Sequence, residues 1–171
     1  FSQNINHWEM VVAAEDTWHY FPGISEPPND WADINFNTAS WSTGIGGFGY
    51  GDNDDGTIIS SVPSVYIRIN FNLIDSSNIA WAILNVDYDD AFVAYLNGHE
   101  IARENSGTVG IRPTYANFAT DYREAQMYTG GNPAQFIIHN DTLKKYLNEG
   151  DNVLALQVHN YNLTSSDLSA I

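Results

Sequence analysis

The sequence predicts an all-β protein, a β-sandwich of jelly-roll type with long loops and one short helix. Several runs of strand length are apolar throughout or alternate between apolar and polar residues. Two of these runs flank the dipeptide Asn97-Gly98, and the segments between runs are irregular and rich in glycine, proline and aromatic residues. A chain of 171 residues is long enough for one domain with its own core. We therefore expect residues 1–171 to form a single module.

The clearest element is a hairpin centred on Asn97 and Gly98. Residues 91–96 are apolar and β-prone at every position, which is typical of a strand covered on both faces. Asn and Gly both accept a positive φ, so the dipeptide suits the two-residue turn that matches strand twist. A second strand is expected to return from His99.

The remaining elements follow from the same patterns. Strands are expected over residues 7–14, 65–73, 79–86, 135–139 and 152–160. A short helix is expected over residues 142–147, with Asn140 or Asp141 as its cap. Residues 16–41 and 105–131 show neither a helical nor a strand period, which predicts two long loops.

Composition excludes several classes of partner. The chain has 21 acidic and 6 basic residues, a formal net charge of −15 that repels nucleic acid and anionic membranes. It has no cysteine, which excludes disulfides and cysteine-ligated zinc. It lacks the run of about 20 apolar residues that membrane insertion needs. Because it begins with Phe1, we expect a module cut from a larger secreted or cell-surface protein.

Two clusters of carboxylates suggest a metal. The first cluster comprises Asp52, Asp54 and Asp55, and the second comprises Asp87, Asp89 and Asp90. Charges this close repel one another unless they are neutralised, and Ca²⁺ binds several carboxylate and carbonyl oxygens at about 2.3–2.6 Å. The sequence thus predicts a structural calcium ion. Solvated acidic turns, or aspartates that accept turn amides, are the alternative.

The irregular segments supply candidates for sugar binding, which needs an aromatic plate and polar groups. In the first loop the candidate plates are Trp18, Tyr20 and Trp31, whereas Trp81, which lies inside an apolar strand, is assigned to the core. In the second loop the candidates are Arg112, Tyr115 and Arg123. The two arginines could pair with an acidic sugar, although ion pairs with the protein's own acids are an equally available use.

Three motifs carry a resemblance to a known family. They are VAYLNGHEIA, which begins with Val93 to Gly98, YLNEGDNVLALQVHN, and FNTASWSTG. Together they resemble the galactose-binding-like jelly roll, such as the sugar-binding domain of family 2 glycosidases. Their order along the chain is also similar to modules appended to large secreted bacterial proteins, including polysaccharide-degrading enzymes. The resemblance implies a β-sandwich that serves as a sugar binder, a spacer or an accessory domain.

These observations favour a non-catalytic carbohydrate-binding module with a structural calcium ion. Such a module would target a larger protein to a polysaccharide or a cell-surface glycan and would contact other domains of the same polypeptide. The alternative is a protein-interaction or spacer domain of a bacterial surface adhesin. An enzyme is disfavoured, because neither a G-x-S-x-G elbow nor an HExxH motif is present and chance alone explains adjacent acids among 21.

Overall fold

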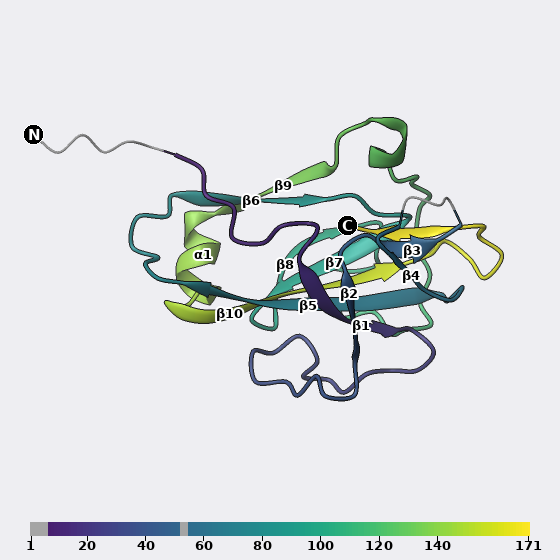
Figure 1. Ribbon diagram of the computed structural model, residues 1–171, viewed down its shortest axis with the longest axis horizontal. Helices are drawn as coiled ribbons and strands as arrows, with labels where there is room; N and C mark the ends of the chain where they lie inside the picture. The colour runs from purple at the N-terminus through teal and green to yellow at the C-terminus, as the bar shows by residue number, and fades with distance from the viewer. Residues whose placement is uncertain (1–6, 52–54) are drawn as a thin grey trace, which may run out of the picture.

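A computed structural model describes residues 7–51 and 55–171. Its largest sheet has six strands in the order β2-β1-β5-β10-β7-β8, with all neighbours antiparallel. The six strands are β1 (Thr17–Pro22), β2 (Ser42–Ile45), β5 (Ser64–Leu73), β7 (Ala91–Leu96), β8 (His99–Glu104) and β10 (Gly150–His159). This sheet is the middle layer in Figure 1.

Two smaller sheets cover one face of the six-stranded sheet (Figure 1). One has the order β11-β3-β4, and the other pairs β6 with β9. Their strands are β3 (Phe48–Tyr50), β4 (Thr57–Ile58), β6 (Trp81–Val86), β9 (Ala134–His139) and β11 (Leu168–Ala170), and the helical elements are η1 (Met127–Thr129) and α1 (Asn140–Tyr146). The prediction of an all-β sandwich with one short helix is confirmed. In the described residues, none of the helices has the length and apolar character needed to cross a membrane.

The predicted hairpin is present. Strand β7 is buried at every position, and Asn97 and Gly98 have φ angles of 50° and 84°. The Asn97 side chain also joins the turn to β10, because its Oδ1 accepts the Val153 N–H at 2.8 Å. The turn residue therefore fixes the register of two strands as well as reversing the chain.

The two faces of the six-stranded sheet are covered in different ways. On one face the smaller sheets enclose an apolar core that includes Phe48, Phe92 and Leu168. On the other face residues 23–41, the lowest segment in Figure 1, fold back over the sheet and bury the fully covered Trp31. These residues, which we call the aromatic segment, act as the second cover that β7 needs.

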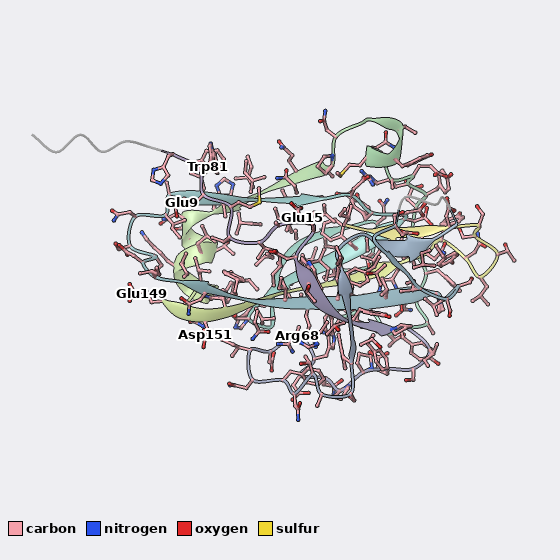
Figure 2. The ribbon with its side chains drawn as sticks, viewed as in Figure 1. Glu9, Glu15, Arg68, Trp81, Glu149 and Asp151 are labelled. Carbon is pink, nitrogen blue, oxygen red and sulfur yellow. The ribbon has the colours of Figure 1, made fainter. Side chains whose placement is uncertain are left out.

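Three expectations about local structure are wrong. Residues 7–14 form no strand. Trp8 and Met10 are 62% and 80% exposed, and none of the residues in this range is buried. Strand β1 lies instead at Thr17–Pro22, where the aromatic residues showed no period. Trp81 is 43% exposed rather than buried, because β6 belongs to a two-stranded ribbon at the surface (Figure 2).

The short helix begins earlier than expected. It covers Asn140–Tyr146 and has His139 at its N-cap position, without a side-chain capping bond. The Asn140 side chain instead donates to the Ile79 carbonyl at 2.7 Å. The Asn140 side chain therefore contacts the segment before β6 instead of capping the helix.

Candidate functional site

The three aspartates before β7 have different surroundings, although all are buried. Asp87 is neutralised by the protein. Its Oδ1 lies 3.3 Å from the Arg123 guanidinium, and its Oδ2 accepts the N–H groups of Gln126 and Met127 at 2.7 Å each. Arg123 also lies over the Tyr88 ring at 4.0 Å. Asp87 thus anchors the segment before η1, and Arg123 serves an internal ion pair.

Asp90 is saturated in a second way. Its Oδ1 accepts the Arg123 backbone N–H at 3.0 Å, and its Oδ2 accepts the Tyr161 backbone N–H at 2.6 Å. One carboxylate therefore holds two segments that lie far apart in the sequence. The aspartates at 87 and 90 satisfy loop amides, which was the alternative to metal binding at these positions.

Asp89 receives no backbone N–H or guanidinium at one of its two oxygens. Its side chain is 3% exposed, and its Oδ1 has no hydrogen-bond partner. Desolvation by burial, together with the neighbouring Asp90 and Asp167 carboxylates, raises the pKa of Asp89 to about 8. The ionised carboxylate is consequently costly to bury here unless a positive charge joins it.

Glu124 and Asp167 complete an acidic trio with Asp89. One carboxylate oxygen from each residue lies within 4.8 Å of the others. Glu124 precedes η1 and Asp167 precedes β11, so the acidic trio draws on three separate segments. This cluster could hold a metal ion, and its all-carboxylate donor set favours a hard cation.

The first acidic cluster is only partly described. Asp52 and Asp54 lie outside the described residues. Asp55 lines a cavity of about 240 Å³ together with Asp87, Met127 and Tyr128. The structure thus brings one member of each predicted cluster to the same cavity, while Asp89 belongs to the acidic trio.

The aromatic plates proposed from the first loop are used for packing. Trp18 and Trp31 are 6% and 0% exposed. Tyr20 is half-buried and packs against Phe48, with ring centroids 5.1 Å apart. The burial of both tryptophans corrects the expectation of exposed plates, because Trp18 packs in the core under the smaller sheets and Trp31 packs in the core under the aromatic segment. Trp41 is also buried, with 8% of its surface exposed.

The remaining candidates from the second loop also have internal partners. The Arg112 guanidinium donates to the Asn29 carbonyl and lies 4.8 Å from the Tyr95 ring centroid. Tyr115 is half-buried, and its backbone N–H donates to the Glu26 carboxylate at 2.8 Å. Arg112 and Tyr115 therefore hold the second loop against the first.

Sequence reasoning missed an exposed pair of aromatic rings beside the acidic trio. Tyr122 and Tyr161, which we call the tyrosine pair, are 58% and 45% exposed, and their rings meet edge to face with centroids 6.4 Å apart. Tyr161 and the residue after Tyr122 are the two that donate backbone N–H groups to Asp90. Spacing in the sequence could not reveal this pair, because Tyr161 follows Tyr122 by 39 positions and no shared motif connects the two. The nearest signal was an aromatic residue close to an acid in each loop, as in Tyr122 and Glu124.

Comparison with known proteins places the fold but not the family. No protein-family model matches the chain, and no curated protein matches its sequence. Among solved structures, a calcium-binding mutant of Bacteroides uniformis β-glucuronidase 2 matches with a TM-score of 0.53 and 13% identity, over 95% of this chain and 18% of that one. Bifidobacterium dentium β-glucuronidase complexed with coumarin-3-O-glucuronide matches with a TM-score of 0.52 and 15% identity, over 88% and 20%. A β-glucuronidase from glycoside hydrolase family 2 matches with a TM-score of 0.49 and 19% identity, over 88% and 15%.

The chain therefore has the fold of one β domain from the Bacteroides uniformis and Bifidobacterium dentium enzymes. It spans 15–20% of the length of the three glycosidases. Identities below 20% extend this likeness to the backbone arrangement and not to individual side chains.

Proposed function

We propose that this chain is a non-catalytic, carbohydrate-binding β-sandwich module of a larger secreted or cell-surface protein. The observation that carries the proposal is the fold match, which covers 95% of this chain but only 18% of a β-glucuronidase. A unit of that size fits an accessory domain better than a complete glycosidase. Calcium binding in that neighbour belongs to the neighbour, and a structural calcium ion in this chain is part of our proposal.

The tyrosine pair is the proposed glycan contact. Aromatic rings accept the apolar face of a pyranose, and rings on anchored segments lose little freedom when they bind. Tyr122 and Tyr161 are exposed, and Asp90 anchors the backbone at position 161 and beside position 122. A surface held in this way is suited to a ring-shaped ligand.

The negative charge of the chain favours neutral glycans over acidic ones. The chain carries a formal net charge of −15, and Arg112 and Arg123 already bind groups of the protein itself. An acidic polysaccharide would meet repulsion without a compensating cation from these side chains. We therefore assign a neutral polysaccharide as the ligand class.

Affinity electrophoresis in gels that contain single polysaccharides tests this proposal. We expect retardation by at least one neutral polysaccharide and none by polygalacturonate or alginate. The double variant Tyr122→Ala with Tyr161→Ala should weaken retention at least 10-fold, because stacking on both rings is lost. Trp81→Ala is the matched control, since Trp81 is also an exposed ring but lies on β6, away from the acidic trio.

A blank result on every polysaccharide would contradict the binding function. Loss of retention in Trp81→Ala, with retention kept in the tyrosine variant, would move the glycan contact to β6. Turnover of chromogenic glycosides by the wild-type chain would contradict the non-catalytic assignment.

One observation favours the second candidate function, a protein-interaction or spacer domain. On the outer side of the β6–β9 ribbon, Trp81 and Ile137 are 43% and 55% exposed, and Trp8 packs edge to face on Trp81 with centroids 4.5 Å apart. Exposed apolar groups in one place suit contact with another protein domain. A blank polysaccharide panel would make this the preferred function.

A further inference from the structure

The acidic trio contains a buried carboxylate, one oxygen of which has no hydrogen-bond partner. Asp89 is 97% covered, and its Oδ1 receives no hydrogen bond, whereas both oxygens of Asp87 and both of Asp90 receive one or more. The nearby backbone donors of residues 123, 126, 127 and 161 are all directed to Asp87 or Asp90. A buried polar atom without a partner destabilises the fold, so a cation bound at this oxygen would be stabilising.

The spacing of the acidic trio fits one ion of calcium size. Two oxygens bound to the same Ca²⁺ can be separated by at most about 5 Å, twice a bond of about 2.3–2.6 Å. The three carboxylate oxygens lie within 4.8 Å of one another, so none has to move far to share an ion. Glu124 and Asp167 are half-buried, which leaves a side open for water to complete the coordination.

We propose that Asp89, Glu124 and Asp167 bind one Ca²⁺ ion, which fastens the segment of Tyr122 to the segment of Tyr161. Glu124 lies two residues after Tyr122, and Asp167 follows Tyr161 by six. Asp90 already joins the same two segments through their backbones. The ion adds a second link between them, from side chains on each segment to one buried carboxylate.

This inference rests on the proposed function and deepens it, because glycan binding by the tyrosine pair would then require a bound cation. It also places the ion at residues that only partly overlap the predicted ligands. Asp89 stays a ligand, Glu124 and Asp167 are added, and Asp87 and Asp90 act as loop anchors.

Calcium titration of the chelator-treated protein by isothermal calorimetry tests the site. We expect one ion per chain, and we expect Asp89→Asn to weaken binding at least 10-fold, since an amide offers one neutral oxygen. Glu149→Gln is the matched control, because it removes one exposed carboxylate beside α1 at the opposite end of the molecule (Figure 2). Asp167→Asn repeats the test at a half-buried position in case Asp89→Asn does not fold, as judged by circular dichroism.

Hydrogen exchange measured by mass spectrometry tests the link. Calcium should slow amide exchange in residues 121–127 and 160–167 of the wild-type chain and leave both unchanged in Asp89→Asn. Absence of binding up to 5 mM Ca²⁺, or equal affinity in Asp89→Asn and wild type, would overturn the site. Binding without slower exchange would overturn the link. Neither readout uses a glycan, so a blank polysaccharide panel and a failed calcium site are separate results.

Discussion

The aromatic segment and the region around the acidic trio both pack against the six-stranded sheet, and they bury charged side chains in different ways. The aromatic segment encloses one cation, Arg68, which is 1% exposed. Its guanidinium donates to the Trp31 and Asp33 carbonyls at 2.8 and 3.1 Å and faces the Phe36 ring. Figure 2 shows Arg68 between the sheet and this segment. Two of its nitrogens thus meet carbonyl oxygens of the chain itself, and its Nε is buried without a hydrogen-bond partner.

The region around the acidic trio buries three aspartates and compensates only two. Asp87 and Asp90 receive N–H groups and a guanidinium, but the Oδ1 of Asp89 receives none. The first region buries a single guanidinium beside carbonyl oxygens, whereas the second buries three carboxylates with one guanidinium beside them. The comparison teaches that an excess of buried like charge, and not one unpaired polar atom, is what supports our proposal of a cation at the acidic trio.

The largest expected effect tests whether the aromatic segment is scaffold. Trp31→Ala should lower the free energy of unfolding by about 3–5 kcal/mol, because it empties a fully buried ring site. Urea denaturation measures this change. Trp81→Ala is its surface control and should change stability by about 0.5 kcal/mol or less. A loss below about 1 kcal/mol in Trp31→Ala would show that the segment is not needed for the fold.

Asp87→Asn should have the next largest effect. An amide cannot neutralise Arg123 and cannot accept from every donor that now reaches Asp87, so a loss of about 2–3 kcal/mol is expected. Urea denaturation in chelator measures it without any contribution from a metal. An unchanged midpoint would contradict the role of Asp87 as an internal anchor.

Asp89→Asn should act in the opposite direction when divalent cations are absent. Because the pKa of Asp89 is raised to about 8, the folded chain holds a proton that the unfolded chain has lost, and stability falls as the pH rises from about 4 to about 8. The neutral amide should therefore stabilise the cation-free protein at pH 8, by about 1–2 kcal/mol. Denaturation in chelator at pH 8 provides the measurement, and a clear loss of stability would contradict our description of Asp89.

The last expected effect is a pH dependence of stability that arises from His159. Burial lowers the pKa of His159 to about 4, below its ordinary value of 6.5. The unfolded chain therefore takes up the proton first, and stability present above pH 6.5 is lost as the pH falls toward 4. The slope from this histidine should approach about 1.4 kcal/mol per pH unit, and His159→Gln should reduce it. His19, whose pKa burial also lowers, adds a residual slope in the same direction.

Local pattern was sufficient to predict the hairpin, since Asn97, Gly98 and the apolar strand before them are adjacent in sequence. It could not sort the tryptophans. Trp31 lies among polar neighbours and is fully buried, whereas Trp81 lies among apolar neighbours and is exposed, because β6 pairs only with β9 at the surface. Burial there depends on sheet order, which one strand does not encode.

The acidic site was predicted in part for a similar reason. The aspartates at 87, 89 and 90 are visible as a cluster, but their donors come from positions 123 to 127 and 161. The other members of the acidic trio, Glu124 and Asp167, come from the same distant segments. Only the folded chain shows which of the three carboxylates remains without a donor.

The way in which Asp90 holds its two segments has a consequence for protein engineering. It accepts backbone N–H groups from Arg123 and Tyr161, so the anchor does not depend on the side chain of Tyr161. Any residue except proline supplies that N–H. Position 161, and position 122 beside the other anchor, can therefore be randomised in a library while the loop ends stay attached, which makes this end of the sandwich a scaffold for selecting new binding specificities.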